Sequence, residues 1–252
     1  MERSPGRGEF PAPLSRTIGA PRAFPGTRPT VRDAVRLLPA PTGWHGGAVS
    51  ISSHVGAVFF SAGVLIEESN PSCLMERRLG LRTAPEENGG TRLDASRWAG
   101  VPTRALCSEL GTLRPLPGVR ETAAWCWEHR LLPVIATAEW APIGAYLAEL
   151  LGFHSYTGTA LEARGGLFTG RGTAAVGAAG HCEMAVRRAA GLGLRPEDCA
   201  VVSADGTDAP LFDVVGCGVA FNAPPEVRCR STATVDDEDL RAVIPALQRM
   251  AP

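Results

Sequence analysis

The chain has 252 residues, a length that suits one compact domain with additional segments. Hydrophobic residues make up 44% of it and charged residues 20%, so it has an ordinary globular composition. The formal net charge of -1 argues against a nucleic-acid binder that works by bulk positive charge. All 25 basic residues are arginine, a bias that high-GC codon usage would favour. Because lysine is absent, every mechanism that needs a lysine amine is excluded.

The first 50 residues are rich in Pro, Gly and Arg, and we expect a disordered arm there with one short helix at 32–38. We favour a tail without a function of its own. The alternatives are an arm that binds an acidic partner, and a transit peptide. The seven cysteines form no C-x-x-C pair, and no apolar run is long enough to span a bilayer. We therefore expect a cytoplasmic protein with reduced thiols and no membrane partner.

From residue 55 onward, strand patterns alternate with helix patterns. Short apolar runs predict buried parallel strands, and 3.6-residue periodicity predicts the helices between them. The predicted strands cover 55–60, 131–137, 199–205 and 217–221, and the predicted helices cover 117–130, 141–153, 180–194, 210–216 and 237–250. This order predicts a doubly wound, Rossmann-like α/β core over 51–68 and 114–252. The polar stretch 69–113 reads as a small cap-like insert after the first strand.

Ligands of such sheets bind beyond the carboxyl ends of the strands. Three loops are therefore the predicted site region: the one after Phe60, the one at Thr137, and the one at 203–208.

Four strings in this order resemble one known family. They are "PLPGV" at 115–119, "VIATAEW" at 134–140, "GGLFTG" at 165–170 and "VVSADGTDAPLFDVVGCGVAFNAPPEV" at 201–227. Together they resemble the haloacid dehalogenase (HAD) superfamily in its phosphoserine phosphatase-like branch. The resemblance implies a HAD-like fold and phosphoryl transfer through an aspartyl-phosphate. That chemistry needs an Asp nucleophile, a second Asp as general acid-base, a Ser or Thr, a Lys and acidic ligands for Mg²⁺.

The loop after the first predicted strand, where the family has its nucleophile and its acid-base aspartate, lacks both carboxylates. Alignment on 63–66 puts Phe60 at the nucleophile position and Ala62 at the acid-base position, and a shift by one residue puts Ser61 and Gly63 there. Ser61 is then the candidate nucleophile, although a serine hydroxyl needs a base beside it.

Thr137 and His181 are the other candidate catalytic and substrate-binding residues. Thr137 matches the Ser/Thr position, where it either donates to an oxyanion or caps a turn. His181 falls at the Lys position, where it is a weak, pH-dependent stand-in for a permanent cation. The alternative for His181, which we favour slightly, is an exposed histidine at a helix start without a ligand role.

The acidic loop is also incomplete. Ala204 replaces the first metal-binding Asp, Asp205 comes one residue late, and Asp208 matches the second Asp. Asp205 and Asp208 make a weak Mg²⁺ site at best, because Mg²⁺ requires octahedral oxygen ligands. The alternatives are a turn at Asp205, which we favour, and a helix cap at Asp208.

The losses concern catalytic positions, whereas the packing residues of the fold remain. We therefore expect a pseudo-phosphatase that acts by binding a small phosphorylated molecule or a protein partner. The alternative is a divergent hydrolase or repurposed biosynthetic enzyme that uses the same pocket. The sequence specifies neither a substrate nor an oligomeric state.

Overall fold

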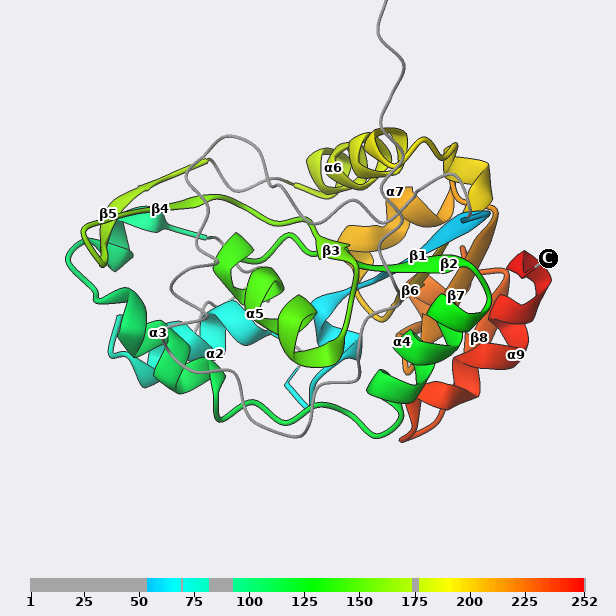
Figure 1. Ribbon diagram of the computed structural model, residues 1–252, viewed down its shortest axis with the longest axis horizontal. Helices are drawn as coiled ribbons and strands as arrows, with labels where there is room; N and C mark the ends of the chain where they lie inside the picture. The colour runs from blue at the N-terminus through cyan, green and yellow to red at the C-terminus, as the bar shows by residue number, and fades with distance from the viewer. Residues whose placement is uncertain (1–53, 69, 82–92, 174–176, 252) are drawn as a thin grey trace, which may run out of the picture.

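The computed structural model describes residues 54–68, 70–81, 93–173 and 177–251 (Figure 1). Its centre is a six-stranded parallel sheet with the strand order β3-β2-β1-β6-β7-β8. The strands are β1 Gly56–Phe60, β2 Leu131–Ile135, β3 Ser155–Tyr156, β6 Cys199–Ser203, β7 Cys217–Phe221 and β8 Ala233–Val235. The predicted doubly wound core is thus confirmed, with two short edge strands, β3 and β8, that the sequence patterns did not indicate.

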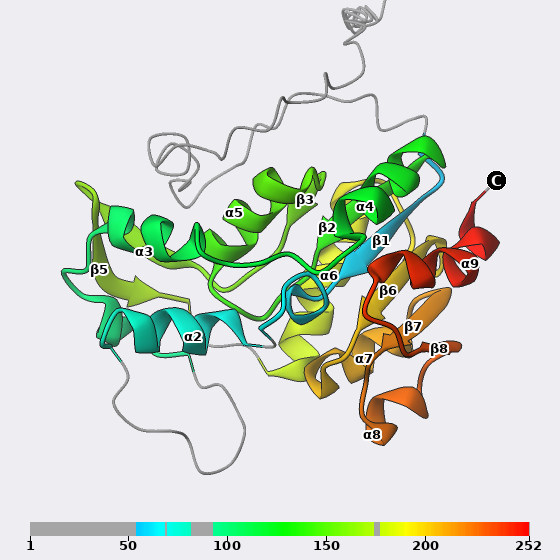
Figure 2. The same ribbon diagram turned by 90° about the horizontal axis from the view of Figure 1, so that it is seen from below.

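Helices cover both faces of the sheet (Figures 1 and 2). One face carries α4 Val119–Glu128, α5 Ala141–Leu151 and α9 Ile244–Leu247, and the other carries α6 Ala178–Gly191 and α7 Ala209–Phe212. The short helix α8 Pro225–Arg228 joins β7 to β8.

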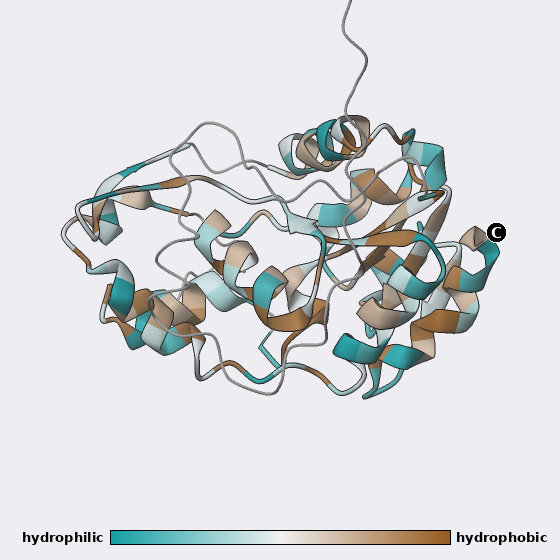
Figure 3. Ribbon diagram, viewed as in Figure 1, coloured by the Kyte–Doolittle hydropathy of each residue, from teal (hydrophilic) through white to brown (hydrophobic). Residues whose placement is uncertain are grey.

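Strand β1 shows why the sheet is covered on both sides. Its five residues are all buried, and they alternate between two apolar cores. Val58 and Phe60 enter the core beneath α4, α5 and α9, whereas Ala57 and Phe59 enter the core beneath α6 and α7. This double burial accounts for the nearly continuous apolar strands in the centre of Figure 3.

The cap lies beside the sheet and consists of two parts of the chain. The insert contributes α2 Pro71–Arg78, the 3₁₀ turn η3 Ala95–Trp98 and α3 Thr103–Leu110. The second part is a hairpin of β4 Leu161–Arg164 and β5 Leu167–Gly172. Backbone hydrogen bonds of 2.9 Å from Gly100 to Phe168 and from Phe168 to Val101 join the two parts at the left of Figure 2.

The C-terminal helix predicted over 237–250 is wrong. The structure has three short pieces there, η6 Leu240–Val243, α9 and η7 Gln248–Met250. Pro245 explains the break, because proline lacks a backbone N–H and disfavours the helical conformation of the residue before it. Leu240, Val243 and Leu247 nevertheless face the core, whereas Ile244 is only half-buried.

Other elements are also shorter than the sequence patterns predict. The second predicted strand ends at Ile135 instead of 137, the third ends at Ser203 instead of 205, and the helix predicted at 210–216 is the single turn α7. The predicted arm at 1–50 lies outside the described residues. None of the described helices combines the length and apolar character that crossing a membrane requires.

Candidate active site

Ser61 is the first residue beyond β1. Phe60 ends the strand and is fully buried, with its ring 5.3 Å from that of Phe153 in the core beneath α4 and α5. The backbone N–H of Ser61 donates a 3.1 Å hydrogen bond to the carbonyl of Val202. Ser61 is therefore the first side chain beyond the carboxyl end of the central strand, the position that the second of the two alignments uses.

Ser61 and Ser203 are neighbours across the two central strands. Phe60 of β1 pairs with Val202 of β6 in the parallel ladder, so the residues that follow them, Ser61 and Ser203, lie side by side. Ser203 ends β6 and is fully buried. Because successive strand residues alternate between faces, both serines fall on the face that α6 and α7 cover.

Helix α6 brings His181 to this edge of the sheet. His181, Ala185 and Ala189 recur every four residues and form the buried stripe of the helix. Alanines at two of these positions let the helix lie close to the strands. His181 is only 1% exposed, so the interpretation as an exposed histidine at a helix start is wrong.

Asp208 connects His181 to the end of β6. Its Oδ1 lies 2.7 Å from Nδ1 of His181, and its Oδ2 accepts a hydrogen bond from the hydroxyl of Ser203. The backbone N–H of Asp205 in turn donates to Ser203 Oγ at 2.9 Å. Asp208 is 2% exposed, and its side chain makes no capping bond at the start of α7. The helix-cap interpretation of Asp208 is therefore wrong.

These residues contain polar atoms that lack a well-formed hydrogen bond. Within the described part of the chain, Ser61 Oγ, both ring nitrogens of His181 and Asp208 Oδ1 are buried without one. The contact between His181 and Asp208 has hydrogen-bond length but is bent away from the linear arrangement of a strong bond. Buried unpaired polar groups are costly and concentrate at functional sites.

Thr137 lies just beyond β2, and it makes the turn-capping contact that the sequence allows. Its Oγ1 accepts a 3.1 Å hydrogen bond from the backbone N–H of Glu139, and its own N–H donates to Thr157 Oγ1. Thr137 is 3% exposed. Because a hydroxyl group accepts and donates at once, this contact leaves the Thr137 proton available for a ligand.

The residues at this edge do not fit Mg²⁺. Asp205 is exposed, and its Oδ1 accepts a hydrogen bond from the N–H of Thr207, which is the turn predicted for it. Both carboxylate oxygens of Asp208 already have a protein neighbour, since Oδ1 contacts His181 and Oδ2 contacts Ser203. No three His, Cys, Asp or Glu side chains of the described segments gather into a possible metal site. The carboxylates of Asp205 and Asp208 are thus engaged within the protein, and they lack the further ligands that Mg²⁺ would require.

Glu139 is a member of the site that the sequence patterns missed. Its Oε2 accepts a 2.8 Å hydrogen bond from the N–H of Ser72, at the start of cap helix α2. Burial raises the pKa of Glu139, and the neighbouring carboxylates of Asp205 and Glu76 raise it further, while the contacts with Ser72 oppose this. Its position two residues after Thr137, in a predicted site loop, is the only sequence signal that could have indicated it.

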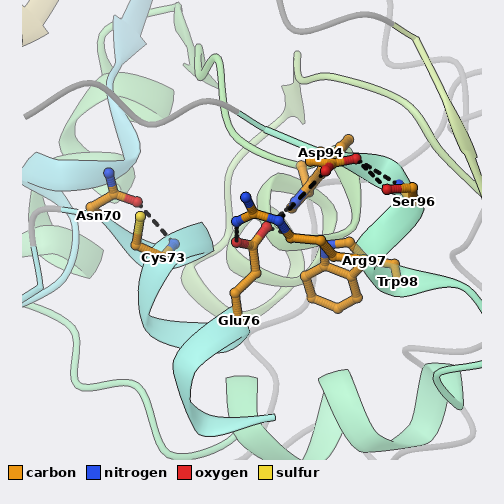
Figure 4. Close-up of polar contacts among 8 residues, drawn as sticks. Asn70, Cys73, Glu76, Asp94, Ser96, Arg97 and Trp98 are labelled. Atoms are coloured by element: carbon orange, nitrogen blue, oxygen red, sulfur yellow. Dashed lines mark hydrogen bonds and ion pairs between the residues drawn. The ribbon is translucent and has the colours of Figure 1, made fainter. Parts of the chain in front are cut away.

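A second buried polar cluster holds the cap (Figure 4). Glu76 of α2 is fully buried, and its Oε1 accepts hydrogen bonds from the indole N–H of Trp98 at 3.3 Å and of Trp140 at 3.4 Å. Arg97 Nη1 lies 3.6 Å from its Oε2. Trp140 belongs to the core and Trp98 to the cap, so this carboxylate joins the two.

Comparison with known proteins supports the architecture. The chain is 16% identical to a phosphoserine phosphatase in its apo form, with a TM-score of 0.63 over 75% of this chain and 98% of the other. A HAD family hydrolase from Salmonella enterica serovar Typhi gives 17% identity and a TM-score of 0.66 over 77% and 72%. A probable phosphoserine phosphatase from Vibrio cholerae gives 19% and 0.60 over 80% and 68%.

No family model matches the sequence, and no curated protein matches it significantly. At such low identities a structural match establishes a fold and not an activity. The three matches nevertheless have TM-scores of 0.60 to 0.66 over 75–80% of this chain. The chain therefore has the fold of the HAD hydrolases, in the form that phosphoserine phosphatases have.

Proposed function

We propose that this protein is a pseudo-phosphatase, which uses the carboxyl edge of the sheet to bind a ligand or a protein partner and does not hydrolyse phosphate monoesters. The observation that carries the proposal is the loop after β1. Ser61 occupies the first position after the strand and Gly63 the position two residues later. Neither can form an aspartyl-phosphate or relay a proton as a carboxyl group does.

The charges at this edge support the same conclusion. The carboxyl groups of Asp205, Asp208 and Glu139 lie in the two loops that follow β2 and β6, and His181 is the basic side chain that contacts Asp208. A fixed cation such as arginine makes the strongest hydrogen bonds to a phosphate dianion. None of the described residues named for this site is an arginine.

The test is hydrolysis of p-nitrophenyl phosphate and of phosphoserine, each with and without added Mg²⁺. We expect no turnover by the full chain in any of the four conditions. Mg²⁺-dependent turnover that Asp208→Ala abolishes would overturn the proposal. Exposed Asp213→Ala, whose carboxylate pairs with Arg230 away from the site, is the matched control for a lost aspartate.

One observation favours a second candidate function, that of a divergent hydrolase. His181 and Asp208 lie 2.7 Å apart in a buried setting, next to a strand that ends in a serine. Such a pair can activate a nucleophile other than aspartate.

A cytoplasmic location stays part of the proposal for either function. It is supported by the seven cysteines, all within the described residues and all free.

A further inference from the structure

We propose that Ser61, His181 and Asp208 form a nucleophilic relay that cleaves small, uncharged carboxylic esters. In this relay Ser61 is the nucleophile, His181 the general base and Asp208 the residue that positions the imidazole. The inference goes beyond the proposed function, because a chain without phosphatase activity can still carry out acyl transfer at the same edge.

The first argument is placement. Ser61 follows the central strand directly, and its N–H is tied to Val202 of β6, so its backbone is fixed. His181 reaches the same face from α6, through a buried stripe that packs on the strands. Asp208 approaches from the loop after β6 and contacts Nδ1 of the imidazole. The three groups thus come from three rigid parts of the fold to one sheet edge.

The second argument is that two buried polar atoms have no hydrogen-bond partner. Asp208 approaches Nδ1 of His181, and Nε2 is the ring nitrogen that this contact leaves unused. Within the described residues Nε2 has no hydrogen-bond partner, and neither has Ser61 Oγ. A base nitrogen and a hydroxyl that are both buried and both unpaired are the two atoms that the relay uses. Contacts of this kind often tighten only when a substrate binds.

The third argument is support for the aspartate. Asp208 Oδ2 accepts the hydroxyl proton of Ser203, whose oxygen accepts the N–H of Asp205. These bonds hold the carboxylate with Oδ1 2.7 Å from Nδ1 of the imidazole, although the contact is bent in the structure as it stands. An aspartate held in this way selects the tautomer of histidine that presents a basic Nε2.

The reaction balances with water as the second reactant. Ser61 Oγ attacks the ester carbonyl carbon and passes its proton to His181 Nε2. The bond from that carbon to the leaving oxygen then breaks, and His181 returns the proton to the leaving alcohol. Water, deprotonated by His181, attacks the acyl-serine and the Ser61–acyl bond breaks. His181 returns the proton to Ser61 Oγ, and the carboxylic acid is released. The hydroxyl of Thr137, next along the edge, is the donor for the oxyanion.

The substrate class follows from burial and charge. Asp205 and Glu139 border the site, so an anionic acyl group is disfavoured. Ser61 is only 7% exposed and His181 only 1%, so a bulky acyl group is disfavoured too. A short, uncharged acyl ester meets both conditions, and p-nitrophenyl acetate is the simplest probe of this class.

The experiment measures acylation of the full chain by p-nitrophenyl acetate. We expect a burst of p-nitrophenol, and an acetyl group on the peptide that contains Ser61 after acid quenching and mass spectrometry. The absence of lysine makes this assay clean, because no lysine amine competes for the acetyl group. Ser61→Ala should abolish the burst and lower turnover by about 10³-fold or more.

Two more variants separate the relay from a merely reactive hydroxyl. His181→Gln should lower the rate about as much as Ser61→Ala, and Asp208→Asn should also change the pH dependence of the remaining rate, as a positioning residue does. Ser155→Ala removes a buried serine of edge strand β3 and should leave the rate unchanged. Acetylation at another residue, or equal rates for the full chain and Ser61→Ala, would overturn the proposal. Either result leaves the phosphatase assay, and hence the proposed function, untouched.

Discussion

The protein contains two buried polar clusters that follow opposite rules. In the cap, Glu76 has its carboxylate surrounded by two indole N–H groups and Arg97. At the sheet edge, His181 and Asp208 are just as buried, yet their facing atoms and Ser61 Oγ lack well-formed hydrogen bonds. A satisfied cluster stabilises a fold, whereas an unsatisfied one costs stability and persists where a function requires it. The difference in hydrogen bonding indicates that the Glu76 cluster is structural and that the cluster at the sheet edge is functional.

The largest effect should come from the cap cluster. Glu76→Ala removes the acceptor of two buried indole N–H groups and the partner of Arg97. We expect the free energy of unfolding to fall by about 3 kcal/mol, since each buried donor left unpaired costs about 1–3 kcal/mol. Urea unfolding followed by tryptophan fluorescence measures this loss directly.

The control for this variant is Glu109→Ala, because Glu109 forms only a long, partly exposed contact of 4.0 Å with Arg78. Its loss should change the free energy of unfolding by about 0.5 kcal/mol or less. If Glu76→Ala is no more damaging than Glu109→Ala, the cap cluster is not structural and the comparison fails.

An intermediate, pH-dependent effect should come from Glu139, which lies between the clusters. Folding raises its pKa above the ordinary value of 4.5, so the folded state binds the proton more tightly than the unfolded state does. The contribution of Glu139 to stability is therefore largest in acid, and it is lost as the pH rises above 4.5 through the folded pKa.

Glu139→Gln mimics the protonated form and keeps an acceptor for the Ser72 N–H. We expect it to be more stable than the unmodified chain at pH 8, with the advantage shrinking towards acidic pH. Thermal unfolding across this range provides the test. An advantage that grows in acid would contradict the raised pKa.

The smallest effect on stability should come from Ser61→Ala, although its effect on ester cleavage is the largest. Its hydroxyl is buried without a hydrogen bond, so replacing it with a methyl group removes an unpaired group. We expect the free energy of unfolding to stay within about 1 kcal/mol or to rise. A loss near that of Glu76→Ala would show that Ser61 is bonded in solution, and would erase the difference between the clusters.

The centre of the sheet could be predicted from the sequence because its strands are almost entirely apolar, unlike the edge strands β3 and β8. The runs at 55–60, 131–137 and 217–221 can be stable only with both faces covered, and this fixes a parallel sheet between helices. Pro245, by contrast, interrupts a periodic helix pattern, and the break at α9 depends on that single residue and not on the apolar spacing.

The site could be predicted only in part. Ser61, Thr137 and Asp208 follow from their places relative to the strands, and His181 follows from the resemblance to the HAD superfamily. The burial of His181 does not follow, because it depends on how closely Ala185 and Ala189 let α6 approach the sheet. Glu76 carried no signal at all, since a glutamate in a polar insert looks solvated until the fold brings two tryptophans to it.

The hydrogen bond from the Ser61 N–H to Val202 has a consequence for energetics. It makes the backbone of Ser61 a continuation of the central strand pair, so the conformational entropy of this residue is lost during folding and not when a ligand arrives. A ligand then meets a preorganised serine, and the entropic penalty that remains is confined to the ligand itself and to whatever the cap must do to admit it.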